Sequence, residues 1–423
     1  MAEPLDLASW EPEYSGNPYP FFARLREQGP VTQVVVEGLA VWLVTRYDDI
    51  RAGLCDPRLS NDPELGDAVT CAVPWVGASV ATARHLLRVD PPDHTRLRRL
   101  VARAFTPRRI EALRPRIQQI ADSLIAAIQP LGSAEMLDAF ALPLPLIVIS
   151  ELFGVPTPDR QEFVQWANLI FGVDQGDGAR IVEARAWVTR YLAELIRRKE
   201  HDRAGLPADA EQGCLLDGLI AARDEGDRLS HTEMVAMSVL LVVAGFETTV
   251  NLIANGLVTL LQHPAQYAAL CADPGLVRPA VEEFLRHESP VKITPFVRIT
   301  TAPVTLGGVE IPAQQPVLFA FGAGNRDPAQ FPDPDRFDIA RGDGHLAFGH
   351  GIHFCLGAPL ARLEAEIAFT TLLAGCPDLA LAVDPARLEW RHSRSLRALK
   401  RLPVTFSPRA AARRADRSGE AGR

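Results

Sequence analysis

The sequence lacks the marks of a secreted, membrane-anchored or nucleic-acid-binding protein. Its 423 residues contain six cysteines without paired spacing, which favours a reducing compartment over a disulfide framework. The first residues have neither the basic stretch nor the apolar core of a signal peptide. No window approaches the ~18 uninterrupted apolar residues of a membrane span. The formal net charge of −8 disfavours nucleic acid as a partner. We therefore expect a cytoplasmic protein with no membrane and no nucleic-acid partner.

No internal repeat and no Gly/Ser-rich linker divides the chain, so we expect one domain over residues 1–406. The Arg/Ala-rich remainder, 407–423, lacks large apolar side chains and is predicted to be a disordered tail. Periodicity predicts helices near 94–104, 108–128, 136–154, 159–172, 180–200, 264–272 and 275–287. Strand patterns occur over 31–47 and near 296–299, 303–311 and 315–318, and a long loop is expected at 61–82. The fold class is therefore mainly α with a small β component.

A long helix is predicted in the middle of the chain. Ser230 and Glu233 have the spacing of a capping box, and the apolar pattern behind them continues to about Gln262. At ~1.5 Å per residue, such a helix spans on the order of 48 Å, enough to cross a whole domain. Within it lies the segment Ala244-Gly245-Phe246-Glu247-Thr248-Thr249.

This segment combines a helix-interior glycine, which costs ~1 kcal/mol, with a carboxylate in an apolar run, which costs more unless it has a partner. We expect the helix to open locally at Gly245, with threonine hydroxyls bonding backbone carbonyls and with water entering. The alternative is a simple kink in which Glu247 reaches solvent.

One cysteine loop stands out near the C-terminus: Phe348-Gly349-His350-Gly351-Ile352-His353-Phe354-Cys355-Leu356-Gly357. An amphipathic run with Leu360, Leu363 and Ile367 follows it, so Cys355 is expected at a helix N-terminus, where a thiolate is favoured. A lone thiolate presented in this way suits a haem iron as axial ligand. A buried structural cysteine is the simpler alternative. A zinc site with His350 and His353 is rejected, because zinc takes about four ligands and the chain has no Cys-x-x-Cys.

The spacing Phe348, Gly351, Cys355, Gly357 resembles the haem-ligand loop of cytochromes P450, and the resemblance extends over roughly residues 12–406. It implies the P450 fold, one large triangular helix-rich unit with a long central helix over the haem. It also implies haem b with the Cys355 thiolate as axial ligand. Further haem contacts are expected at Ala244, Phe348, Gly349, His353 and Gly357. The N-terminus without an anchor, the segment Asp90–Arg96 and the cysteine loop together resemble the soluble bacterial class of the family. High Arg and Ala usage with few lysines favours a GC-rich, actinomycete-like source.

The resemblance also assigns roles to residues far from the cysteine loop. Glu247 and Thr248 match the family's oxygen-activating acid–alcohol pair and are the expected catalytic residues: Thr248 holds ordered water and Glu247 helps to deliver protons. Glu283 and Arg286 match its Glu-x-x-Arg motif, and Arg336 is expected to join them in a structural network. The expected haem-propionate partners are His94, Arg98, Arg298 and His353.

The substrate pocket is the least defined part of the site. Its candidates are Leu240, Val243, Ala244, Ile293, Thr294, Phe296 and Leu396, with parts of 72–86 and 165–180. A basic patch for an acidic ferredoxin is expected among Arg96, Arg99, Arg103, Arg108, Arg109 and Arg362.

The resemblance implies a monooxygenase that uses O2 and electrons from NAD(P)H through a reductase and a ferredoxin. A hydrophobic small molecule is the expected substrate, with a macrolide or other polyketide favoured and a terpenoid or steroid second. A peroxide-driven oxygenase, a carbon–carbon or aryl coupling enzyme and a non-catalytic haem sensor stay open as alternatives.

Overall fold

A computed structural model of the chain describes residues 5–11, 13–36, 38–62, 64–65, 84–103, 105–172, 178–203, 214–224, 229–342 and 344–408. The predicted tail therefore lies outside the described residues from 409 onward, as does most of the expected loop at 61–82. The α-helices are α1 (Glu13–Gly16), α2 (Tyr19–Gln28), α3 (Tyr47–Cys55), α5 (Asp93–Ala102), α6 (Pro107–Ala112), α7 (Arg114–Ile128), α8 (Pro143–Leu152), α9 (Arg160–Gly172), α10 (Gly178–Arg203), α11 (Leu215–Asp224), α12 (His231–Leu261), α13 (Pro264–Ala272), α14 (Val277–His287), α15 (Phe321–Gly324) and α16 (Ala358–Gly375).

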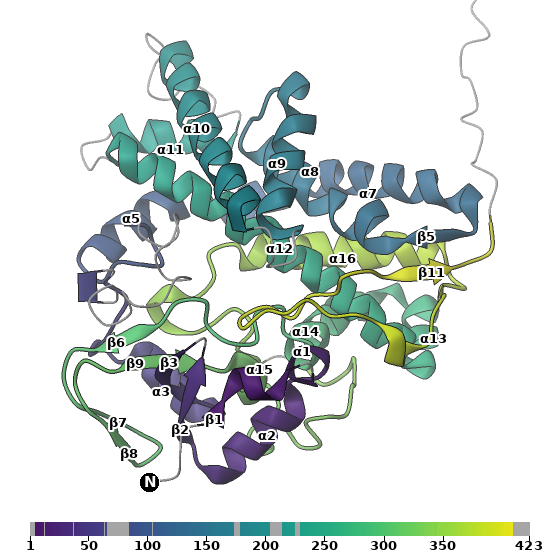
Figure 1. Cartoon of the computed structure of the whole chain (residues 1–423). Helices are drawn as coiled ribbons and strands as arrows, with labels where there is room; N and C mark the ends of the chain where they lie inside the picture. The colour runs from purple at the N-terminus through teal and green to yellow at the C-terminus, as the bar shows by residue number, and fades with distance from the viewer. Residues whose placement is uncertain are drawn as a thin grey trace, which may run out of the picture.

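The strands form three small sheets. They are β1 (Leu5–Asp6), β2 (Val31–Val36), β3 (Leu39–Val44), β4 (Leu59–Ser60), β5 (Ser133–Glu135), β6 (Arg298–Thr300), β7 (Val304–Leu306), β8 (Val309–Ile311), β9 (Pro316–Phe319), β10 (Ala380–Leu381) and β11 (Pro403–Thr405). The largest sheet has the order β1-β2-β3-β9-β6-β4, and the others are β10-β11-β5 and β7-β8. Figure 1 shows this largest sheet with α2 and α3 below α12, and α7 to α11 above it.

The predicted strand pair at 31–47 is confirmed as the antiparallel hairpin of β2 and β3. Its register places Val34 opposite Val41, and both side chains are fully buried in one core cluster with Val36 and Leu43. The alternation of valines therefore faces one side of the sheet, as a period of two requires. Because β3 also pairs in parallel with β9, the N-terminal hairpin is joined to a strand almost three hundred residues later in the chain.

The predicted long helix is confirmed as α12. Ser230 accepts from the backbone N–H of Glu233, and the Glu233 side chain accepts in return from that of Ser230, which completes the capping box. The helix continues for 31 residues without interruption, so the expected local opening at Gly245 does not occur. Gly245 instead makes room for Ile149 of α8. A Cβ added at Gly245 would lie only 3.1 Å from the Ile149 Cδ1 atom.

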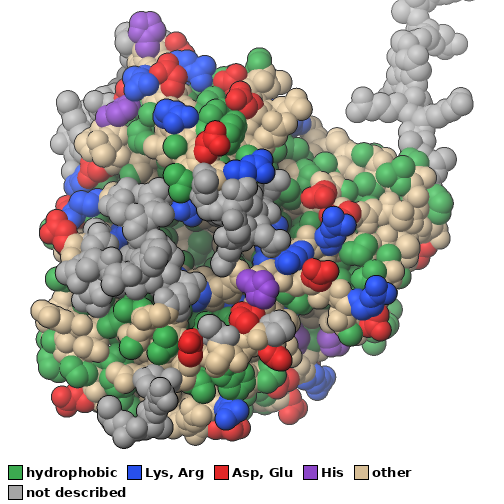
Figure 2. All heavy atoms as spheres, viewed as in Figure 1, with side chains coloured by type: hydrophobic (Ala, Val, Ile, Leu, Met, Phe, Trp, Pro, Cys, Tyr) green, Lys and Arg blue, Asp and Glu red, His purple; other side chains and the backbone are tan. Residues whose placement is uncertain are grey.

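Helix α12 is long and apolar enough to cross a membrane, with a mean hydropathy of 1.7 over its most apolar window. Most of that window is buried inside the fold. A core helix of a globular protein has the same length, composition and burial. On the face drawn in Figure 2, acidic and basic side chains are interspersed with apolar ones among the residues shown in colour.

The C-terminal half of α12 is packed more tightly than the N-terminal half. Every residue from Val250 to Leu260 is buried. A Cβ added at Gly256 would come within 2.9 Å of the rings of Phe284 on α14 and Phe369 on α16. Glycine is therefore required here by close approach, and the three helices are fixed against one another.

Candidate functional site

The cysteine loop lies at the start of α16, as the sequence predicts. The Cys355 backbone N–H donates to the Phe348 carbonyl at 2.9 Å, which closes the loop on itself. Gly351 has φ +71°, and a Cβ there would also lie 3.1 Å from the carbonyl oxygen of Leu54, so this turn requires glycine. The loop presents the Cys355 thiol to a cavity between α16 and α12.

This cavity has a volume of about 300 Å³. Its lining includes Cys355, Phe348 and His353 of the cysteine loop and Ala244 and Thr248 of α12. The remaining lining is mainly apolar and comes from several elements: Leu54, Leu86, Leu87, Phe105, Ile149, Leu240, Leu241, Leu252, Leu285, Pro290, Val291, Pro295, Phe296, Phe321, Ala347, Leu356, Leu360 and Ala361. A concave apolar site with a few polar groups suits a flat hydrophobic group together with a hydrophobic ligand.

Several groups act on the thiol of Cys355. Burial raises its pKa, although the backbone N–H groups of Gly357 and Ala358 and the charges of Arg98 and Arg362 lower it. A bound metal cation also lowers this pKa, because a coordinating thiol is deprotonated outright.

Four basic side chains converge on the edge of the cavity. The rings of His94 and His353 lie 4.3 Å apart between centroids, and Arg98 and Arg298 line the cavity beside them. Desolvation and the charges of Arg298, His94 and Arg98 together lower the pKa of His353 to about 3. Desolvation likewise lowers the pKa of Arg298 to about 10, against the opposing effect of Asp90 and Cys55.

This cluster has polar atoms without partners. Among the described residues, His94 Nε2 and His353 Nδ1 are buried and make no hydrogen bond. The charges of Arg98 and Arg298 repel each other, and the two buried histidine nitrogens lack hydrogen-bond partners. An anionic group that accepts hydrogen bonds would relieve both costs. The two propionates of a haem supply them, and the adjacent thiol supplies an axial ligand, so the residues present fit that group.

Comparison with known proteins decides the family. The family model described as Cytochrome P450 matches residues 8–273 and 275–376. The chain belongs to the cytochrome P450 family. Its haem is therefore haem b with Cys355 as the axial ligand, and the protein is a P450 monooxygenase of the bacterial type.

Individual relatives cover almost the whole chain. The P450 is 48% identical over 407 residues to cytochrome P450 monooxygenase PikC of Streptomyces venezuelae, covering 95% of this chain and 94% of that protein. It is 46% identical over 402 residues to the vitamin D(3) 25-hydroxylase of Pseudonocardia autotrophica, covering 93% and 95%. The solved structure of the Bacillus subtilis 168 bacillaene polyketide synthase cytochrome P450 PksS is 39% identical, with a TM-score of 0.84, and covers 93% of this chain and 98% of that one.

The two residues of the acid–alcohol pair are neighbours on α12, but only one of them lines the cavity. Thr248 lines the cavity, and its Oγ1 donates to the Ala244 carbonyl at 2.8 Å. Glu247 is not among the described residues that line it. Desolvation raises the pKa of Glu247 to about 8, although Arg391 and Arg185 act to lower it. The carboxyl group therefore holds a proton at neutral pH.

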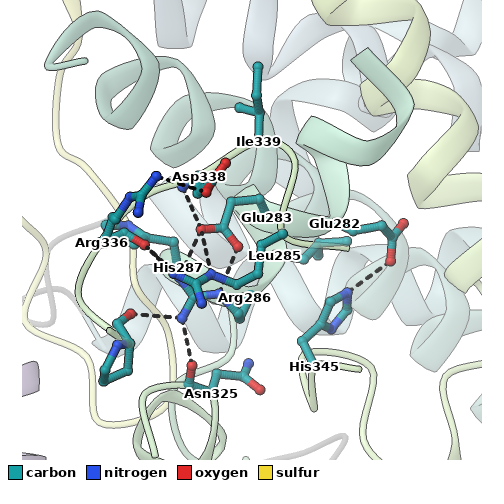
Figure 3. A network of polar contacts seen from close by, with 12 residues as sticks. Glu282, Glu283, Leu285, Arg286, His287, Asn325, Arg336, Asp338, Ile339 and His345 are labelled. Carbon is teal, nitrogen blue, oxygen red and sulfur yellow. Dashed lines mark hydrogen bonds and ion pairs between the residues drawn. The ribbon is translucent and has the colours of Figure 1, made fainter. Parts of the chain in front are cut away.

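Glu283 and Arg286 form the centre of a fully buried network (Figure 3). Arg286 donates from Nε to one Glu283 oxygen at 2.7 Å and from Nη2 to the other at 2.8 Å. Its Nη1 donates to the carbonyls of Asn325 at 2.9 Å and Pro334 at 2.8 Å. A buried ion pair costs more free energy for every N–H donor or oxygen acceptor left without a partner, and these carbonyls satisfy the N–H groups of Arg286 Nη1.

Arg336 takes part in this network without touching Glu283. Its backbone carbonyl accepts from Arg286 at 3.2 Å, and its mostly exposed guanidinium pairs with Asp338 at 3.2 Å. The Asp338 backbone N–H donates in turn to Glu283 at 2.9 Å. A further arginine, Arg341, has a side chain that approaches Glu283, at 3.7 Å from Nε to Oε1.

A second polar group lies beside this network and faces the cysteine loop. Glu282 accepts from Arg362 Nε at 2.6 Å and Nη2 at 2.8 Å, and it bonds His345 Nε2 at 2.9 Å. The Arg362 guanidinium lies 4.5 Å from the centroid of the Phe348 ring. Arg96, also expected in the basic patch, instead pairs with Glu233 at the capping box of α12.

The pocket candidates divide into two groups. Leu240, Ala244, Thr294 and Phe296 line the cavity, as does Leu86 from the candidate range 72–86. Residues 72–83 of that range and 173–177 of the range 165–180 lie outside the described residues.

Val243, Ile293 and Leu396 are not among the described residues that line the cavity. Ile293 is fully buried in the core cluster of the β2–β3 hairpin, and Val243 packs against the helical core. Leu396 bridges to Val291, which itself lines the cavity. Ile149, Leu241 and Phe105 line the cavity but were not predicted, because no sequence signal tells which face of an apolar helix meets a ligand.

One buried carboxyl was also missed. Glu364 lies on α16, one helical turn after Leu360 and Ala361, which line the cavity. It is 2% exposed, and its Oε2 has no hydrogen-bond partner among the described residues. Desolvation raises its pKa to about 8.

Proposed function

We propose that this P450 monooxygenase hydroxylates or epoxidises a hydrophobic natural product, using O2 and electrons that come from NAD(P)H through a reductase and a ferredoxin. The observation that supports the proposal is that Thr248 and Cys355 line the same apolar cavity, with Glu247, whose pKa is raised to about 8, next to Thr248 on α12. Haem held by Cys355 supplies the activation of O2 and the oxidation of an unactivated carbon centre.

The two residues of α12 have separate tasks in this proposal. The Thr248 hydroxyl holds ordered water in the cavity, since its own proton is donated to the Ala244 carbonyl and its oxygen lone pairs remain to accept. Glu247 supplies a proton from the side of α12 that Arg185 and Arg391 approach. A carboxyl with a pKa near the operating pH is suited to give up and regain a proton in each turnover.

The apolar lining favours a large hydrophobic substrate, and the relatives favour a polyketide. PksS is named as a polyketide-synthase P450, and its structure aligns with almost the whole chain. The vitamin D(3) 25-hydroxylase relative makes a steroid-like compound the second candidate. Leu240, Leu241 and Phe296 line the space in which such a molecule would lie over the haem.

The electron donor is proposed to be an acidic ferredoxin that docks beside the cysteine loop. Arg103, Arg108 and Arg109 are exposed, and α6, which carries the last two, packs against α16. Charge complementarity of this kind accelerates docking and selects the partner. We further propose that the enzyme works in the cytoplasm, where ferredoxin and NAD(P)H are found; its longest apolar helix is largely buried in the fold.

An optical titration tests the proposal. Purified enzyme is titrated with macrolactones, linear polyketides, steroids and terpenes, and displacement of water from the iron is followed as a shift towards the high-spin spectrum. Compounds that shift the spectrum are then incubated with NAD(P)H, a ferredoxin reductase and a ferredoxin, and in parallel with hydrogen peroxide alone.

A hydroxylated or epoxidised polyketide formed with NAD(P)H supports the proposal in full. Faster turnover with peroxide than with NAD(P)H and ferredoxin would assign the enzyme to the peroxide-driven class. A coupled product would assign it to carbon–carbon or aryl coupling. Binding without any product under either condition would favour a haem sensor.

A further inference from the structure

Arg362 connects the docking face of the enzyme with the surroundings of the cysteine sulfur. Its side chain is 37% exposed, so one part of it meets solvent. The flat face of its guanidinium lies 4.5 Å from the centroid of Phe348, which lines the cavity with Cys355. The Phe348 carbonyl also accepts the Cys355 N–H at 2.9 Å. A shift of Phe348 therefore changes the surroundings of Cys355 through both the phenyl ring and this backbone hydrogen bond.

The position of Arg362 over this ring is set by Glu282 rather than by the ring. Two nearly parallel bonds, at 2.6 and 2.8 Å, hold the guanidinium in a fork on the carboxylate. His345 holds the second Glu282 oxygen at 2.9 Å, and its ring lies 5.8 Å from that of Phe348. Arg362 and His345 together lower the pKa of Glu282 to about 2, so the carboxylate is charged at every physiological pH. Figure 3 shows His345 pointing to Glu282 beside the buried Glu283–Arg286 network.

We propose that Arg362 is a positioning residue for Phe348, and that an acidic ferredoxin competes with Glu282 for its guanidinium when it docks. This inference rests on the proposed ferredoxin partner and adds to it a coupling between docking and the haem. The hydrogen bonds and apolar groups around a cysteine ligand control the reduction potential of its metal. Docking therefore changes the reduction potential of the haem before any electron is transferred.

A positioning role depends on the two parallel N–H donors of the planar Arg362 guanidinium, and not only on its positive charge. A lysine in its place keeps the charge but offers neither two parallel donors to Glu282 nor a planar group to stack on Phe348. A role in bulk electrostatics is therefore preserved in Arg362→Lys, whereas a positioning role is lost. Arg24 of α2 provides the matched control: it is exposed and its guanidinium lies 5.2 Å from the centroid of the Trp10 ring, and it has no part in the proposed docking face.

The test is a potentiometric titration of the holoenzyme followed by its haem absorbance. Wild type, Arg362→Lys, Glu282→Gln and Arg24→Lys are each titrated alone and with a plant-type [2Fe–2S] ferredoxin in which gallium replaces iron, so that only the haem titrates. We expect Arg362→Lys and Glu282→Gln to change the equilibrium constant for haem reduction by about threefold or more. Arg24→Lys is expected to match the wild type. Bound gallium ferredoxin should shift this constant in the wild type and in Arg24→Lys but not in Arg362→Lys.

Each outcome decides one part of the proposal. Equal equilibrium constants for haem reduction in the wild type and Arg362→Lys would overturn the positioning role of Arg362. They would mean that only its positive charge matters. A wild-type constant that bound ferredoxin does not change would overturn the competition with Glu282. If the ferredoxin fails to bind any variant, the proposed partner class is wrong, while the titrations without ferredoxin still decide the positioning role. Should Arg362→Lys not retain haem, Glu282→Gln carries the same test, because it releases the fork while leaving Arg362 in place.

Discussion

Glu364 gives the sharpest test of the energetics described above. An acid whose pKa is raised in the folded state destabilises that state as the pH rises, because the unfolded chain ionises first. The pKa of Glu364 is ordinarily 4.5 and rises to about 8 in the folded state. The free energy of unfolding therefore begins to fall near pH 4.5 and reaches its lowest value above about pH 8. A rise of this size corresponds to about 5 kcal/mol of unfolding free energy.

Replacement of Glu364 by glutamine should remove this loss while keeping the shape of the side chain. At pH 5 the two proteins should have similar unfolding free energies, since a neutral carboxyl and an amide are both buried there. The variant should become the more stable one as the pH rises, by up to about 5 kcal/mol at pH 9. Guanidinium unfolding of the holoenzymes at pH 5, 7 and 9 measures the difference directly.

Glu366→Gln on the same helix is the matched control, because the Glu366 side chain is partly exposed and pairs with Arg114 at 2.9 Å. Its difference from the wild type should not grow with pH in this way. A Glu364→Gln difference that stays constant from pH 5 to pH 9 would refute the reasoning, and it would mean that a partner for Oε2 compensates the burial of the charge.

Other predictions follow from the same geometry. Thr248→Ala should lower the share of electrons recovered in product several-fold and release peroxide instead, whereas Thr248→Ser should retain most of the coupling; equal coupling in both would remove the hydroxyl from the mechanism. Cys355→Ala should lose the thiolate-type spectrum of the carbonyl complex, and its retention would mean that another residue is the ligand. Arg286→Ala should cost about 3–5 kcal/mol and lower haem content, because Glu283 is left buried without its partner, while the exposed Arg336→Ala should change neither.

The sequence predicted those parts of the fold in which local signals and tertiary packing agree. The capping box at Ser230 and Glu233 and the valine alternation of β2 each have a single physical solution, and both were found as expected. The segment 108–128 looked like one helix but is α6 and α7, which meet at Leu113, two residues before Pro115. The segment 136–154 contains a π-helical turn, Leu137–Ala141, before α8 begins. Such breaks depend on how helices pack and leave no mark on hydrophobic periodicity.

The site divides in the same way. Cys355 and Thr248 were expected at the site from the motifs that carry them, and both line the cavity, whereas the roles of Thr248 and Glu247 stay predictions. The lining at Ile149, Leu241 and Phe105 was not expected, because any apolar side chain of suitable size can fill such positions. Arg336 shows a further limit: its main chain bonds Arg286 while its guanidinium is mostly exposed, and sequence spacing does not tell which part of a residue makes the contact.

The unequal packing along α12 has a consequence for changing the substrate range in the laboratory. Leu241 and Ala244 line the cavity and are not members of the buried core cluster, so a library that varies them should keep most members folded. Beyond Val250 the same helix is enclosed on all sides, and Gly256 is in contact with two phenyl rings. Mutations there would alter the frame that holds the haem rather than the molecule being oxidised. One helix thus carries an adaptable half and an invariant half, and the acid–alcohol pair lies at the boundary between them.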